Sequence, residues 1–198
     1  MRLAASIVLA SIFVFSGCRS GRTVLELFVV SADSGSDGVL YIRRSADLGT
    51  ARSDPDTVAR GLLADRGAPS LLHSTSWRWE KDGTIILTYL AWCDAFRFDG
   101  LQPQRLPRER IPEIPATNPE KPRPPEIREL DVIAHGLRHL SFLVQHDRDG
   151  RLAAALSPRS LEFFNSLCGQ LAGNFDQAAA TPCLSSASTS RAAPPSRQ

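Results

Sequence analysis

A proline-rich stretch divides this chain into two parts that must fold differently. Eight of its 14 prolines lie between Pro103 and Pro125, interspersed with arginine and glutamate. Proline lacks the backbone N–H that helix interiors and central strands require, so neither element can cross this stretch. We therefore expect residues 101–125 to be an extended, polyproline-II-like connector, with strands before it and helices after it.

Before the connector, the sequence predicts two β-hairpins with a short helix between them. Four runs are rich in apolar and β-branched residues and predict strands, at 23–30, 39–44, 71–79 and 84–92. Asp82-Gly83 between the last two favours a tight hairpin, because glycine tolerates a positive φ. Asp54-Pro55 predicts a helix start, with Asp54 as N-cap, and Gly67 marks its end.

After the connector, apolar residues at steps of three and four predict a long helix over 126–145 and a second over 157–173. The expected class is therefore α+β: a small mixed or antiparallel sheet in the order ββαββ, a proline-rich crossover, and two C-terminal helices. This order resembles part of a Nudix-type α/β/α sandwich in outline. The metal-binding pattern of that family is absent, so we infer no pyrophosphatase activity.

The two ends of the chain differ in character from its middle. Residues 1–17 are a signal-like leader, with Arg2 followed by an apolar run from Leu3 to Phe15 that is too short to span a membrane. Residues 176–198 are polar and small, and we expect a disordered tail. The remaining residues, 19–175, are expected to form one α+β domain interrupted by the connector.

The quartet Phe15-Ser16-Gly17-Cys18 ends the leader. It resembles the lipobox of bacterial lipoproteins, although Phe15 stands where that motif usually has leucine. The resemblance implies that Cys18 is acylated and becomes the mature N-terminus, which anchors the protein to a membrane of the bacterial cell envelope. More than one acyl chain makes such an anchor stable.

Two other interpretations of the leader stay open. A conventional signal peptide cleaved near Gly17 would need no lipid. Alternatively, the start codon is misplaced and the protein is cytoplasmic, because a strand begins only five residues after Cys18. If Cys18 is acylated, Cys93, Cys168 and Cys183 remain, an odd number that leaves a free thiol or an intermolecular bond.

Charge and motifs exclude several classes of function. The formal net charge is +2, far from the basic surface that nucleic acids select. Phosphate-binding loops and a G-x-S-x-G serine elbow are absent from the sequence, and we expect no cofactor. The sequence thus favours a non-enzymatic, envelope-anchored binding or accessory domain with an unidentified protein or small-ligand partner. The alternative is a cytoplasmic α+β protein with a metal-assisted hydrolase or regulatory role.

Aromatic residues on the second hairpin are the candidate ligand-binding surface. Strict alternation puts His73, Thr75, Trp77 and Trp79 on one face of the strand, and Leu72, Ser74, Ser76 and Arg78 on the other. Trp77, Trp79 and Tyr89 would offer flat apolar area, and Arg78 would bind an anion or stack on a ring. Ordinary packing between strands is the competing interpretation.

Three histidines lie on the long helix, at 135, 139 and 146. Their helical positions oppose the apolar stripe, so we expect all three to project away from the core. His135 and His139, four residues apart, are a candidate transition-metal pair, but position 136 is glycine where a catalytic H-E-x-x-H motif has glutamate. A solvated polar face is therefore the favoured interpretation.

Overall fold

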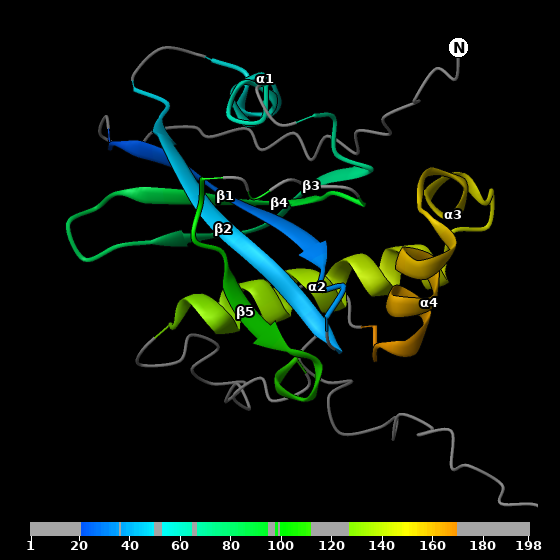
Figure 1. The fold of residues 1–198 in the computed structure, drawn as a ribbon. Coiled ribbons are helices and arrows are strands. Elements are labelled where there is room, and N and C mark those ends of the chain that lie inside the picture. The colour runs from blue at the N-terminus through cyan, green and yellow to red at the C-terminus, as the bar shows by residue number, and fades with distance from the viewer. Residues whose placement is uncertain are drawn as a thin grey trace, which may run out of the picture.

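A computed structural model describes residues 21–35, 37–49, 53–64, 67–94, 98, 100–111 and 127–169. These residues form a mixed five-stranded sheet with helices on both faces (Figure 1). The α+β class and the mixed sheet are confirmed. The strands are β1 (Thr23–Ala32), β2 (Gly38–Asp47), β3 (Leu71–Trp79), β4 (Ile85–Trp92) and β5 (Gln104–Pro107).

The strands lie side by side in the order β3-β4-β1-β2-β5. β1 and β2 form an antiparallel hairpin, and so do β3 and β4, around a turn in which Gly83 has a φ of +85°. The two hairpins join through β1 and β4, which run parallel. β1 and β4 therefore occupy the interior of the sheet, and β3 and β5 are its edges.

β5 corrects the prediction that the proline-rich stretch is a connector from its first residues. Leu106 pairs with Val39 of β2 and is fully buried, so this part of the stretch belongs to the core. β5 lies at the sheet edge, where a missing backbone N–H is tolerated, and it ends at Pro107. A short 3-10 turn, η1 (Arg108–Arg110), follows. The rest of the predicted connector, 112–125, lies outside the described residues.

Helix α1 (Pro55–Gly61) covers one face of the sheet, and α2 (Glu129–Gln145), α3 (Arg151–Ala155) and α4 (Pro158–Ser166) lie on the other (Figure 1). Asp54 caps α1 as predicted, because its carboxylate accepts a hydrogen bond from the Thr57 backbone N–H at 3.0 Å. In the described residues 127–169 there are three helices rather than the two predicted, since α3 was not expected.

α4 is shorter than predicted and ends at Ser166 rather than near Gly173. Gln145 of α2 explains the early end. Its side-chain amide donates hydrogen bonds to the carbonyls of Phe164 and Leu167, at 3.0 and 2.8 Å. A side chain from a neighbouring helix therefore satisfies carbonyls that a further helical turn would have used.

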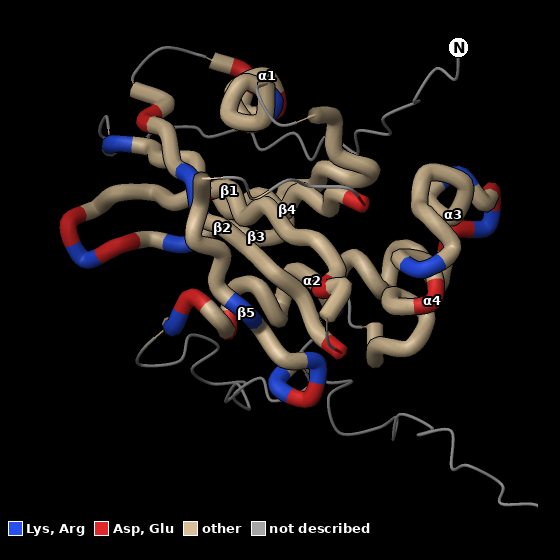
Figure 2. Tube along the Cα trace, viewed as in Figure 1, with Lys and Arg blue, Asp and Glu red and all other residues tan. Residues whose placement is uncertain are grey.

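Alternation along β1 divides the core into two parts. Leu25, Leu27 and Val29 pack under α1, while Phe28 and Val30 pack against α2 and its neighbours. Charged residues lie in loops, at strand ends and on the helices, as Figure 2 shows. In the part of the chain that the structure describes, no helix has the length and apolar character to span a membrane.

Candidate functional site

A β-bulge in β3 decides which side chains face α2. The pairing of Ser74 with β4 is followed directly by that of Ser76, so Thr75 is an extra residue with no partner in the register. Alternation shifts by one position at the bulge. Arg78 therefore faces α2, as His73 does, and strict alternation was the wrong prediction for this strand.

The residues that were predicted to form one ligand-binding surface do not come together in the structure. Tyr89 is buried under α1, and its hydroxyl donates to Asp56 at 2.7 Å. Burial and the Asp56 carboxylate raise the Tyr89 pKa. Arg78 points to the opposite face, so Trp77 and Trp79 are left as an exposed pair, 46% and 38% accessible, with ring centroids 6.3 Å apart.

A line of polar side chains lies between the sheet and α2, where an apolar interface is expected. We call it the polar seam, and it consists of Glu26, His73, Thr75, Arg78, Thr88 and His139. Four of these six are almost completely buried. Polar groups cost free energy when they are removed from water, so each needs a hydrogen-bond partner. Such a line of polar groups in a core is the candidate functional site of this fold.

A buried ion cluster forms one end of the seam. The Glu26 carboxylate accepts hydrogen bonds from both terminal nitrogens of Arg78, at 2.8 and 3.2 Å, and from Thr88 Oγ1 at 3.3 Å. Arg43 of β2 reaches the same carboxylate at 2.8 Å. Burial acts to lower the Arg78 pKa, but the hydrogen bonds and charge of Glu26 outweigh it, so the net shift is upward.

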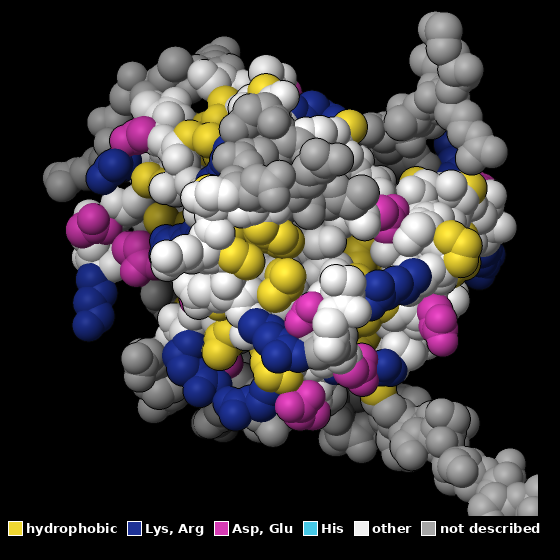
Figure 3. Space-filling model, viewed as in Figure 1, with side chains coloured by type: hydrophobic (Ala, Val, Ile, Leu, Met, Phe, Trp, Pro, Cys, Tyr) yellow, Lys and Arg dark blue, Asp and Glu magenta, His cyan; other side chains and the backbone are white. Residues whose placement is uncertain are grey.

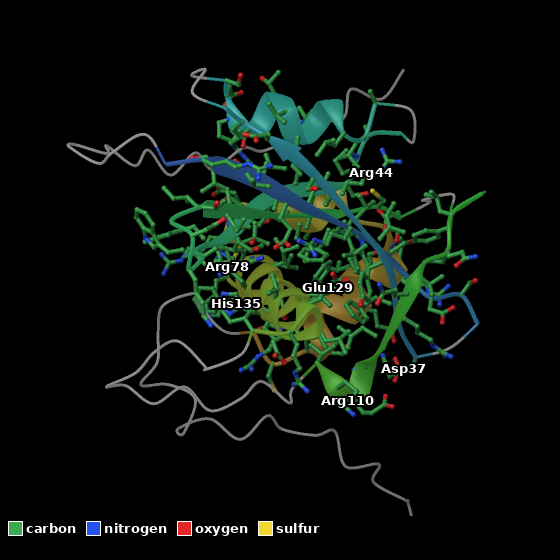
Figure 4. The ribbon with its side chains drawn as sticks, turned by 90° about the vertical axis from the view of Figure 1, so that its left-hand side faces the viewer. Asp37, Arg44, Arg78, Arg110, Glu129 and His135 are labelled. Carbon is green, nitrogen blue, oxygen red and sulfur yellow. The ribbon has the colours of Figure 1, made fainter. Side chains whose placement is uncertain are left out.

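Arg43 carries the ion cluster to the protein surface. We call the group that it forms with Tyr41, Gln104 and Glu129 the seam mouth; Gln104 is exposed and Tyr41 is buried. Arg43 is half exposed and lies 3.5 Å from Glu129 of α2. Burial and the Glu129 carboxylate raise the Tyr41 pKa to about 12, and its hydroxyl donates to Gln104 at 2.8 Å. Among buried side-chain atoms of the described residues, Glu129 Oε1 is the one without a hydrogen bond. In Figure 4, Arg78 and Glu129 lie where the sheet meets α2.

Two histidines form the other end of the seam. The Nε2 atoms of His73 and His139 are 3.1 Å apart, while their ring centroids are 5.1 Å apart with 23° between the planes. The rings therefore meet head to head through Nε2, with one nitrogen donating and the other accepting. Burial, together with the neighbouring His139, lowers the His73 pKa to about 4. Burial also lowers the His135 pKa.

The prediction that all three helix histidines project away from the core is wrong for His139, which is buried. Gly136 is the reason. A Cβ at this position would lie 2.8 Å from Leu90 Cδ1, so the helix approaches the sheet most closely along its glycine side. The face of α2 that packs on the sheet is therefore shifted toward Gly136 and includes His139. His146 is exposed, as expected, and its ring stacks on Phe142 with centroids 4.0 Å apart.

Of the predicted metal pair, His139 contacts His73 of β3 through Nε2. Among the residues that the structure describes, no group of three histidine, cysteine or acidic side chains is arranged to hold a metal ion. Two adjacent neutral imidazoles are therefore the most that the seam offers as ligands.

The two cysteines that the structure describes, Cys93 and Cys168, supply no nucleophile to the site. Cys93 is a free thiol that is buried under α1, and burial raises its pKa to about 12, so the reactive thiolate is scarce. Cys168 is disulfide-bonded. Cys18, the predicted lipid attachment site, lies outside the described residues.

Sequence reasoning missed Glu26, the centre of the ion cluster. The available signal was a single charged residue inside the apolar run 23–30, which is unusual in a buried strand. It also missed Asp94 after β4. The carboxylate of Asp94 accepts hydrogen bonds from Ser70 and Ser157, at 2.6 and 2.7 Å, and ties β4 to the start of α4.

The sequence was also compared with known proteins. No protein-family model matches this chain, and no curated protein matches it.

Proposed function

We propose that this protein is a non-enzymatic binding or accessory domain that is anchored to a membrane of the bacterial cell envelope through Cys18. One observation supports the non-enzymatic part most strongly: the side chains suited to chemistry are engaged with one another. His73 is hydrogen-bonded to His139, and Arg78 is held by Glu26. Cys93 is buried and protonated at neutral pH. None of these groups is left poised to attack a substrate.

The seam mouth is the place where a ligand would bind. Glu129 Oε1 is buried without a hydrogen bond and would accept one from a ligand, and the half-exposed Arg43, which contacts the other oxygen of this carboxylate, would attract an anionic group. A small ligand or protein segment with an amide or amine next to a carboxylate matches this pair.

We also propose that residues 112–125 form an extended proline-rich crossover between the ββαββ portion and the C-terminal helices.

Fractionation of native cells tests the anchoring. The wild-type protein is expected in the membrane fraction, and Cys18→Ala is expected to release it. Mass spectrometry of the mature N-terminus should find an acylated Cys18. Recovery from the soluble cytosol of a chain beginning near Val24 would overturn the proposal and support the alternative of a cytoplasmic protein.

A second candidate function is the metal-assisted role, and the His73–His139 pair is the observation that favours it. An Nε2–Nε2 distance of 3.1 Å is close to that of adjacent ligands on an ion with bonds of about 2.0–2.1 Å. Metal binding would replace the hydrogen bond between the rings. Titration with zinc or nickel, followed by thermal unfolding, tests it: stabilisation lost in His139→Ala but kept in His146→Ala would establish the site.

A further inference from the structure

We infer that the end of the molecule formed by the β3–β4 hairpin lies on the lipid bilayer, with Trp77 and Trp79 seated in the membrane interface. This inference rests on the proposed lipid anchor at Cys18 and adds an orientation to it. The occupant of the tryptophan surface is thus the lipid itself.

The first residues that the structure describes lie beside the tryptophan pair. The Arg22 carbonyl accepts a hydrogen bond from the Ile85 backbone N–H at 2.9 Å, and Thr23 pairs with Ile85 in the β1–β4 register. Ile85 in turn pairs with Trp79 on the edge strand β3. The start of β1, the start of β4 and the end of β3 therefore lie next to one another, at the left-hand end of the sheet in Figure 1.

The tether from the anchor to this end is short. Four residue steps separate Cys18 from Arg22 in the sequence, and an extended chain covers about 14 Å in four steps. A lipid on Cys18 would thus hold Arg22 within that distance of the bilayer surface, and the end of β3, two strand spacings from β1, within about 10 Å more. A longer linker would let the domain turn freely, whereas this one keeps the same end toward the membrane.

The exposed chemistry of the hairpin end suits a membrane interface. Trp77 and Trp79 are the exposed large apolar side chains of the described residues, and tryptophan favours the boundary between headgroups and acyl chains. Their edge-to-face contact makes a continuous aromatic surface on the α1 side of β3.

Charge plays a smaller part at this end than the aromatic rings. The hairpin turn carries charges of both signs, visible at the left-hand side of Figures 2 and 3. Glu80 pairs with Arg78 at 2.9 Å, and Asp82 accepts from the Thr84 backbone N–H at 2.9 Å. Lys81 is exposed between them and can meet an anionic headgroup. We therefore expect the docking to depend mainly on the two tryptophans.

Quenching by brominated lipid tests the orientation directly. The acylated full-length protein, purified from membranes, is reconstituted into vesicles of phosphatidylethanolamine and phosphatidylglycerol whose acyl chains carry bromine. Of the three tryptophans, Trp92 is 0% exposed and serves as an internal reference. We expect a blue shift and a loss of roughly half of the emission on reconstitution, since bromine quenches indoles at the depth of the interface.

Variants identify the source of the signal. Trp77→Phe/Trp79→Phe retains only Trp92, and its emission should not change on reconstitution. Adding His146→Trp to that background puts an indole after the C-terminal end of α2, near α3 and α4 and away from the hairpin, and it should also stay unquenched (Figure 1). Quenching of His146→Trp would mean that the opposite end faces the lipid and would overturn the inference.

The two proposals fail in different ways. If the wild-type protein does not associate with vesicles, the lipid anchor is wrong and the orientation falls with it. If it associates but its tryptophans are not quenched, the anchor stands and the docking surface is wrong. In that case Trp77 and Trp79 serve a protein partner or another copy of the chain instead.

Discussion

His73 and His139, 66 residues apart in the sequence, hydrogen-bond through their Nε2 atoms at 3.1 Å and so link the edge strand β3 to α2. In this bond one Nε2 donates and the other must be unprotonated to accept, so the two rings cannot both be cationic. Its first consequence is a dependence of stability on pH.

Acidification should destabilise the protein well above the pH at which its carboxylates titrate. The His73 pKa falls from 6.5 to about 4 on folding, so the unfolded chain binds the proton more readily. Stability is fully present above pH 6.5 and is lost as the pH falls toward about 4. We expect a loss on the order of 2 kcal/mol, allowing for the partial exposure of His73, in urea unfolding measured between these pH values.

His73→Gln provides the control for this prediction. Its amide can still hydrogen-bond to His139 but does not titrate, so stability at pH 7 should change little and the acid-dependent loss should shrink. Burial also lowers the His135 pKa, so part of the pH dependence remains. An unchanged pH profile in His73→Gln would show that the pair does not govern the response.

Removing the Glu26 carboxylate should be far more damaging than removing an exposed one. Glu26→Gln leaves Arg78 and Arg43 facing each other across a buried neutral amide, which we expect to cost about 3–5 kcal/mol in free energy of unfolding. Glu80→Gln removes a partly exposed partner of the same Arg78 and should cost less than about 1 kcal/mol. Equal effects in chemical denaturation would contradict the assignment of Glu26 as the centre of the cluster.

Any side chain at position 136 should destabilise the protein, although Gly136 lies in the middle of a helix. In Gly136→Ala the new methyl group would lie 2.8 Å from Leu90 Cδ1 and 3.3 Å from Thr75 Cγ2, so we expect a destabilisation of about 1–3 kcal/mol. Gly61→Ala in α1 meets nothing within 4 Å and should be neutral or mildly stabilising. Thermal unfolding of the two variants tests the close approach of α2 to the sheet at Gly136.

Neither of the two described cysteines should react with an alkylating reagent in the native protein. Cys168 is disulfide-bonded and Cys93 is a buried free thiol, so alkylation of the native protein should label neither one. Because Cys93 is free, the cysteines left to pair with Cys168 in the same chain are Cys18 and Cys183. An acylated Cys18 leaves Cys183, and non-reducing peptide mapping should find a Cys168–Cys183 peptide. A Cys18–Cys168 peptide would contradict the lipid anchor.

The sequence by itself determined the elements whose signals are local. Asp82-Gly83 predicted the β3–β4 hairpin because a turn of this kind needs a residue that tolerates positive φ. Asp54-Pro55 predicted the start of α1, since the cap and the helix it serves are adjacent in the chain. The class of the fold followed from the same short-range patterns.

Tertiary structure alone decided the site. The bulge at Thr75 turned Arg78 toward Glu26, the closeness of α2 at Gly136 carried His139 into the core, and Gln145 ended α4 early. Each of these depends on contacts between segments far apart in the chain. Residue spacing records local backbone preference, whereas a bulge, a helix rotation or a cap from another helix is selected by the packing that it permits.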